Sequence, residues 1–176
     1  MNRISGYLLG IGSNIKPAEN IVSIMALLLE HFPQLSLSRV LKIPPIGMNS
    51  QHDFLNVVVF IETDLSEDEL KAICNIIEIS LGRDRTDPTR KMKDRSADLD
   101  ILAAASFPNA TSIKASEITD EYFLYPLLEE ISAYLSDQDY QLSQTGVALQ
   151  LNDLSFGQSA TTINSQTYTS DKRIIQ

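Results

Sequence analysis

The sequence predicts an α+β sandwich in which two helices cover one face of an antiparallel sheet. Three observations support this prediction: short apolar stretches typical of strands, two stretches with apolar residues at helical spacing, and their order along the chain, β-α-β-β-α-β. A chain of 176 residues, 43 % of them hydrophobic, can form one domain with a substantial core and has little room for two.

The first half of the chain predicts three strands and one helix. An apolar run from Gly6 to Ser13 predicts the first strand, and a stretch rich in valine from Phe54 to Thr63 predicts the third. Between them, Leu35 to Ile43 alternates apolar with polar residues and predicts a half-exposed strand. The helix begins near Pro17 and ends before Pro33, because proline suits the first helical turn and interrupts a helix elsewhere. Its apolar residues recur at helical spacing: Ile21, Ile24, Met25 and Leu28.

The following segments predict a second helix, a fourth strand and a further helix. Ser66 and Glu69 have the spacing of a capping box, which predicts a helix start at this point. The apolar stripe of this helix consists of Leu70, Ile73, Cys74, Ile77 and Leu81. Asp98 to Ala104 predicts the fourth strand, and Pro126 begins another helix. The order β-α-β-β-α-β is that of a ferredoxin-like sandwich, so this is the predicted fold, with C-terminal additions.

The C-terminal part of the chain has a weaker pattern. After Ser136 the helical spacing fades, and residues 159–170 are dense in Ser, Thr, Asn and Gln. We therefore expect one domain over residues 1–135. Residues 136–176 are predicted to be a C-terminal extension, a hairpin or a loose tail, that belongs to the same domain.

Composition argues against several classes of protein. The 23 acidic and 14 basic residues give a net charge of −9, which is unfavourable for a nucleic-acid binder because phosphates repel it. No apolar run approaches the ~18 residues of a membrane span. A single cysteine excludes an internal disulfide, and the N-terminus is a poor signal peptide. The expected location is the reducing cytoplasm.

The strongest local feature is a pair of aspartates in the fourth strand. Asp98 and Asp100 point to the same side of a strand, about 7 Å apart, and repel each other unless a positive charge lies between them. A hard divalent cation such as Mg²⁺ suits this geometry, with phosphate oxygens completing its coordination. The alternative is a solvated strand face, but aspartate is a poor strand former, so two in one strand need a reason.

A basic segment precedes these aspartates. Six of the 14 Lys and Arg residues fall between Arg83 and Arg95, which is typical of a loop that binds polyphosphate. Acidic residues alternate with them, so a solvated loop is the alternative. Asn56 is an amide inside an apolar strand, either a satisfied core residue or a reader of a heterocyclic ring. Glu78, taken alone, is interpreted as a surface glutamate.

Together these segments resemble 6-hydroxymethyl-7,8-dihydropterin pyrophosphokinase, a family of folate-pathway enzymes. The resemblance covers roughly Tyr7 to Pro126 and rests on the order and spacing of several short pieces. These are Gly10-Ile11-Gly12-Ser13-Asn14, Pro44-Pro45-Ile46-Gly47, Phe54-Leu55-Asn56, Glu78 with Gly82-Arg83, Arg95 to Ile101, and Tyr125-Pro126-Leu127. The family has the ferredoxin-like fold that the element order predicts. It transfers pyrophosphate from ATP to the pterin hydroxymethyl group and releases AMP.

The resemblance implies a role for each matching residue. Asp98 and Asp100 would hold two Mg²⁺ ions, and ATP would be the co-substrate. The pterin would be bound by Asn56, Phe54, Tyr122 and Pro45. The nucleotide would be bound by Glu78, Arg83, Arg85 and Arg95, with Arg83 and Arg95 as the catalytic, phosphate-handling arginines. The family also suggests a monomer with small-molecule partners only.

The chain departs from the family pattern after the metal-binding strand. Residues 113–122 contain no histidine, although the family has one on a phosphate, and Asp120 or Glu121 stands near the position of a family arginine. The basic loop carries Met92 where an aromatic residue is frequent. A second hypothesis is therefore a catalytically impaired relative that binds a ligand or a partner. A middle version of it is a kinase for another small alcohol, which would share the metal site but not the pterin pocket. An RNA-recognition domain shares the element order but lacks its aromatic signature here.

Overall fold

The core of the molecule is a six-stranded antiparallel sheet. The computed structural model describes residues 2–46, 50–83, 86, 94–111 and 113–165. The strand order is β5-β1-β4-β2-β8, and β3 pairs with β4 beside β2. The strands are β1 (Ile4–Ser13), β2 (Gln34–Leu37), β3 (Leu41–Ile43), β4 (Phe54–Glu62), β5 (Asp98–Phe107) and β8 (Thr161–Asn164).

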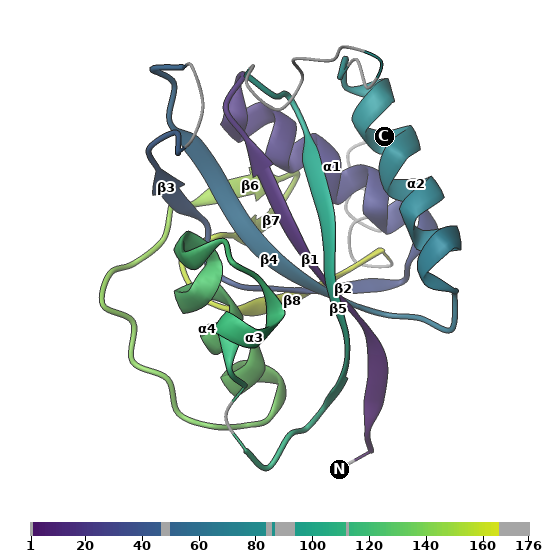
Figure 1. Ribbon diagram of the computed structural model, residues 1–176, viewed down its shortest axis with the longest axis vertical. Coiled ribbons are helices and arrows are strands. Elements are labelled where there is room, and N and C mark those ends of the chain that lie inside the picture. The colour runs from purple at the N-terminus through teal and green to yellow at the C-terminus, as the bar shows by residue number, and fades with distance from the viewer. Residues whose placement is uncertain (1, 47–49, 84–85, 87–93, 112, 166–176) are drawn as a thin grey trace.

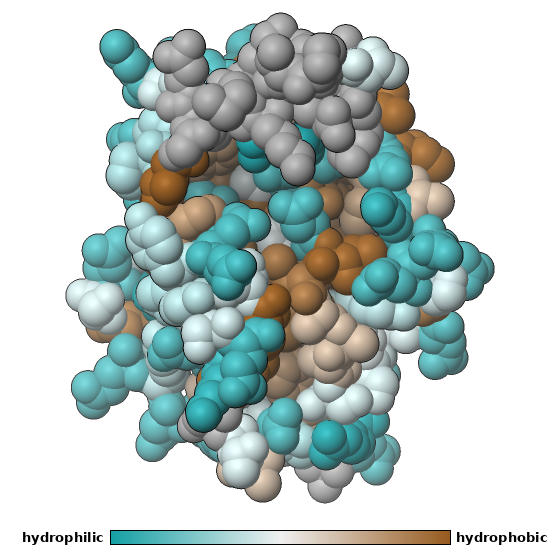
Figure 2. Space-filling view, viewed as in Figure 1, coloured by the Kyte–Doolittle hydropathy of each residue, from teal (hydrophilic) through white to brown (hydrophobic). Residues whose placement is uncertain are grey.

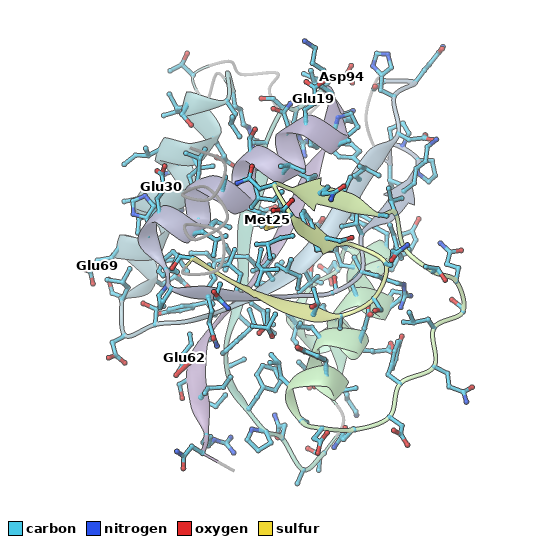
Figure 3. The ribbon with its side chains drawn as sticks, turned by 180° about the vertical axis from the view of Figure 1, so that it is seen from behind. Glu19, Met25, Glu30, Glu62, Glu69 and Asp94 are labelled. Atoms are coloured by element: carbon cyan, nitrogen blue, oxygen red, sulfur yellow. The ribbon has the colours of Figure 1, made fainter. Side chains whose placement is uncertain are left out.

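Two helices cover one face of this sheet. Figures 1 and 3 show α1 (Pro17–His31) and α2 (Glu67–Ser80) on the side of the sheet opposite the later helices. The capping box predicted for α2 is present, since Ser66 and Glu69 bond each other's backbone N–H groups. The predicted fold class is confirmed: the four principal strands have the order β5-β1-β4-β2, with α1 and α2 packed together on one face.

The opposite face is covered by the short helices that follow β5. They are α3 (Ala115–Ile118), the 3₁₀ turn η2 (Tyr122–Leu124) and α4 (Tyr125–Leu135). Successive strand residues point to opposite faces, so Leu9 and Val57 pack on the α1 side, whereas Leu8 and Val58 pack on the α4 side. The sheet is therefore buried on both sides, which explains the nearly continuous apolar run of β4.

The prediction of one half-exposed strand from Leu35 to Ile43 is wrong. The segment forms two strands, β2 and β3, separated by residues 38–40, and every residue from Leu35 to Leu41 is buried. The reason lies far along the chain: Val40 pairs through its backbone N–H and C=O with Gly157 and Val147. The C-terminal segment therefore covers a surface that the alternating pattern assigned to solvent.

Residues after α4 add to the sheet and the core. A hairpin of β6 (Leu149–Leu151) and β7 (Leu154–Phe156) places its apolar side chains in the α1 core, and β8 pairs with β2 at the sheet edge. Arg39, 1 % exposed, forms a buried ion pair with Glu130 of α4, whose carboxylate also accepts from the Ala160 N–H. No helix within the described ranges is long and apolar enough to span a membrane.

Candidate active site

A cavity of about 800 Å³ lies where β3, β4, β5, α2 and the segment before α4 meet. Its walls are partly apolar and partly charged, and Figure 2 shows hydrophilic and hydrophobic surface side by side on this face. The lining residues are Ile43, Pro44, Ile46, Phe54, Asn56, Glu67, Lys71, Cys74, Asn75, Arg83, Arg95, Asp98, Leu99, Asp100, Ile101, Asp120, Glu121, Tyr122 and Phe123.

Two glycines of β1 lie between residues of β4 and β5 that line this cavity. Gly12 pairs with Asn56 of β4 on one side and with Asp98 of β5 on the other, and Gly10 pairs with Asp100. A Cβ atom on Gly12 would lie 2.7 Å from Asn56 Oδ1, closer than real Cβ contacts allow. The central strand therefore carries no side chain between the amide and the two aspartates, so one ligand can reach both.

The two aspartates of β5 flank Leu99 and have different electrostatic surroundings. Asp98 is bound by Arg83 Nη1 at 2.7 Å and by Arg95 Nη1 at 3.0 Å. The pKa of Asp100 is raised to about 6 by burial and by the negative charges of Asp98 and Glu121, with Glu78 adding to them and Arg83 opposing them. The basic groups of the protein therefore do not fully balance the negative charge around Asp100. Such a site favours a bound cation.

The fit of this pair to a metal ion follows from the donor atoms. No group of three or more His, Cys, Asp and Glu side chains within the described ranges is arranged to hold a metal. Two carboxylates at the edge of an open cavity suit Mg²⁺, which keeps several waters and takes its remaining oxygens from a phosphate ligand. The predicted Asp98 and Asp100 are therefore compatible with Mg²⁺ only together with an oxygen-rich ligand.

Glu78 is buried beneath the cavity, so its interpretation as a surface glutamate is wrong. The residue is 0 % exposed, and its Oε2 accepts from Arg83 Nη1 and from the Leu99 backbone N–H, both at 2.8 Å. Because β5 is an edge strand, an outward N–H such as that of Leu99 needs a partner outside the sheet. Glu78 is that partner, and it is not one of the lining residues.

An amide and aromatic rings also line the cavity. Asn56 is 7 % exposed, and its side chain and that of Phe54 line the cavity from β4. Tyr122 is exposed and lines the cavity beside Phe123. Pro45 is partly buried and is not one of the lining residues, whereas Pro44 and Ile46 on either side of it are.

Acidic side chains also enter the cavity from the segment before α4. Asp120 and Glu121 both line it, so the departure from the family pattern lies within the site. The pKa of Glu121 is raised by burial and by the charge of Asp98, whereas Arg95 opposes the shift. The wall that faces the aspartate pair is therefore acidic.

Some predicted residues fall outside the described part of the chain, and some lining residues were not predicted. Arg85 lies outside the described residues, as do Gly47, Arg90, Lys91, Met92 and Lys93. Lys71 and Asn75 of α2 line the cavity although no sequence argument selected them. Their spacing of four puts them on one face of α2, and only the packing of α2 beside β5 assigns that face to the cavity.

Comparison with known proteins covers this same part of the chain. The model of the 7,8-dihydro-6-hydroxymethylpterin-pyrophosphokinase family matches residues 8–133. The chain belongs to this family. The match includes all the candidate site residues and ends within α4, before the β6–β7 hairpin and β8. The family and enzyme class predicted from the sequence are thereby confirmed.

Three relatives illustrate the similarity, each named 2-amino-4-hydroxy-6-hydroxymethyldihydropteridine pyrophosphokinase. The Porphyromonas gingivalis protein is 32 % identical over 106 residues, 59 % of this chain and 72 % of the relative. The Bacillus subtilis protein is 36 % identical over 107 residues, 58 % of this chain and 60 % of the relative. The Methylorubrum extorquens protein is 32 % identical over 124 residues, 67 % of this chain and 69 % of the relative.

Proposed function

We propose that the protein transfers a pyrophosphoryl group from ATP to 6-hydroxymethyl-7,8-dihydropterin and releases AMP. The observation that carries the proposal is the row Asn56, Gly12 and Asp98 across three neighbouring strands. This row brings the Asn56 amide and the Asp98 carboxylate, with Asp100 beside it, to one face of the sheet with no side chain on β1 between them, which supports a site for a ring next to a metal-bound phosphate. The matching family and the names of its relatives support the same reaction.

The nucleotide end of the proposed site combines acidic and basic groups. Asp98 and Asp100 are proposed to hold two Mg²⁺ ions, which would neutralise charge on the ATP phosphates. Arg83 and Arg95 are proposed to bind phosphate oxygens after giving up part of their contact with Asp98, which a metal would then occupy. Glu78 is proposed to act on the nucleotide indirectly, because it holds Arg83 and the backbone between the two aspartates.

The pterin end of the proposed site suits a flat heterocycle with polar edges. The Asn56 amide can both donate to and accept from such an edge, and its burial strengthens each bond. Phe54 and Tyr122 are proposed to pack on the two faces of the ring. Pro45 is proposed to contribute through the backbone of the Pro44 to Ile46 wall.

The proposed transfer needs no nucleophile from the protein. The substrate hydroxyl oxygen forms a bond to the β phosphorus of ATP, and the bond from that phosphorus to the α,β-bridging oxygen breaks. AMP leaves with the bridging oxygen, and the hydroxyl proton passes to solvent. The protein aligns the two substrates and balances the phosphate charge with Arg83 and Arg95.

The test is AMP formation from ATP, Mg²⁺ and the pterin by the wild type and two variants. Asp98→Ala and Asp100→Ala should each remove activity, while Asp153→Ala, in the turn between β6 and β7, should leave it unchanged. Full turnover in both active-site variants would overturn the metal-binding role. No AMP from a folded wild type would overturn the proposed reaction.

A second candidate function has its own observation. Asp120 and Glu121 place negative charge on the wall that would face the phosphates. This favours a relative with impaired catalysis that retains a ligand-binding or partner-binding role. Calorimetry with Mg²⁺ and ATP separates the two candidates, because tight binding supports the kinase and its absence supports the impaired relative.

A further inference from the structure

Asn14, at the end of β1, joins two chain segments that border the cavity. Its backbone N–H donates to the Arg95 carbonyl at 2.9 Å, and its Oδ1 accepts from the Arg95 N–H at 2.6 Å. Its Nδ2 donates to Asp94 Oδ1 at 3.0 Å and to the His52 carbonyl at 3.3 Å. One buried amide thus fixes the backbone before β5 and the backbone before β4.

A side-chain hydrogen bond connects the same two segments. His52 Nδ1 lies 2.5 Å from Asp94 Oδ2, and the His52 N–H also bonds Ser50. Hydrogen bonds from Ser50 and His52 hold the pKa of Asp94 below its usual value, so this carboxylate is ionised at neutral pH. Figure 3 labels Asp94 beyond the end of β1, at the end of the sheet where these segments meet.

The residue that this cluster holds is Arg95. Its side chain lines the cavity, is largely buried and reaches Asp98 Oδ2. Asn14 fixes both backbone polar groups of Arg95, and the adjacent Asp94 is held by Asn14 and His52. An arginine whose backbone is already fixed loses less conformational entropy when it binds a phosphate, so the cluster should affect affinity for that ligand.

We propose that Asn14, His52 and Asp94 are positioning residues that hold Arg95 ready for the phosphates of the nucleotide. The inference rests on the proposed function for its ligand and adds residues that have no place in the proposed chemistry. His52 also precedes Phe54 by two residues, so this hydrogen bond connects the segment that leads to Phe54 with the segment that holds Arg95.

The test compares variants of the His52–Asp94 hydrogen bond with a matched control. The variants are His52→Gln and Asp94→Asn. The control is Asp53→Asn, which removes a neighbouring exposed pair between Asp53 and Lys42, 3.8 Å apart, that does not contact Arg95. Calorimetry with Mg²⁺ and α,β-methylene ATP measures nucleotide affinity, and AMP formation gives kcat and the KM for each substrate.

Each variant should bind the nucleotide roughly two- to fivefold more weakly, as expected for the loss of one partly exposed polar contact. The KM for the pterin and the melting temperature of each variant should stay close to wild type. The control Asp53→Asn should leave both the nucleotide affinity and the KM for the pterin unchanged. In an Arg95→Ala background, Asp94→Asn should have no further effect on nucleotide affinity, because no guanidinium remains to be positioned.

Two outcomes would overturn the inference alone. One is unchanged nucleotide affinity in both variants while the wild type binds and turns over ATP. The other is an undiminished effect of Asp94→Asn in the Arg95→Ala background, which would assign the cluster to general stability. A wild type that binds no nucleotide would instead overturn the proposed function and this inference with it.

Discussion

Replacement of Glu78 tests how the buried carboxylate supports both the fold and the site. Glu78→Leu removes the acceptor of two donors, Arg83 Nη1 and the Leu99 N–H. An unsatisfied buried N–H costs about 1–3 kcal/mol, and breaking a buried ion pair costs about 3–5 kcal/mol. Because Arg83 keeps its bond to Asp98, we expect a total loss of about 3–5 kcal/mol.

Glu78→Gln separates stability from activity. The amide oxygen keeps one acceptor but loses the charge, so the expected loss of stability is about 1.5–3 kcal/mol, the value of a hydrogen bond to a charged group. The folded variant should also lose activity, because Arg83 and the backbone between Asp98 and Asp100 are then held by a neutral acceptor in place of a charged one. Urea unfolding measures the stability, and AMP formation by the folded variant measures the activity.

The matched control is Asp68→Asn, an exposed acid in the first turn of α2, which should change stability by less than about 1 kcal/mol. If Glu78→Leu lost no more unfolding free energy than Asp68→Asn, the reasoning would be refuted, because neither donor would then depend on Glu78. Wild-type activity in Glu78→Gln would refute the positioning role while leaving the stability argument intact.

The remaining predictions concern other parts of the structure. The pKa of Asp100 is raised to about 6, so the folded state favours its protonated form; stability from this group is lost as pH rises from about 4 to above 6. Asp100→Asn should therefore raise the melting temperature at pH 8 more than at pH 4, and equal shifts would contradict the assignment. Gly12→Ala should raise the KM for the pterin, because the new Cβ meets Asn56 Oδ1; steady-state kinetics with unchanged KM would exclude this contact. Arg39→Ala should lose about 3–5 kcal/mol in urea unfolding, because it leaves the Glu130 charge buried; a loss below about 1 kcal/mol would contradict the buried pair.

Much of the fold could be predicted because its signals are local. The capping box needs only Ser66 and Glu69, and alternation along β1 and β4 needs only neighbouring residues. The order of these elements limits the topologies that connect them without crossing. The same local reasoning found the Asp98 and Asp100 pair, because two acids at strand spacing share one side of the strand.

Only the tertiary structure decided how residues far apart in the sequence meet. The helical spacing around Glu78 predicts an exposed side chain. In the structure Glu78 is buried, because α2 packs beside the edge strand β5 and the Leu99 N–H donates to its carboxylate. Arg39 is buried because Glu130, 91 positions away, supplies the opposite charge.

The site shows the same division between sequence and tertiary structure. The sequence determined which chemical groups are available: paired carboxylates, arginines, a strand amide and two glycines. The registers of β1 with β4 and β5 decided that Asn56, Gly12 and Asp98 lie in one row. Backbone periodicity is a property of neighbouring residues, whereas strand register and charge pairing depend on the free energy of the whole folded chain.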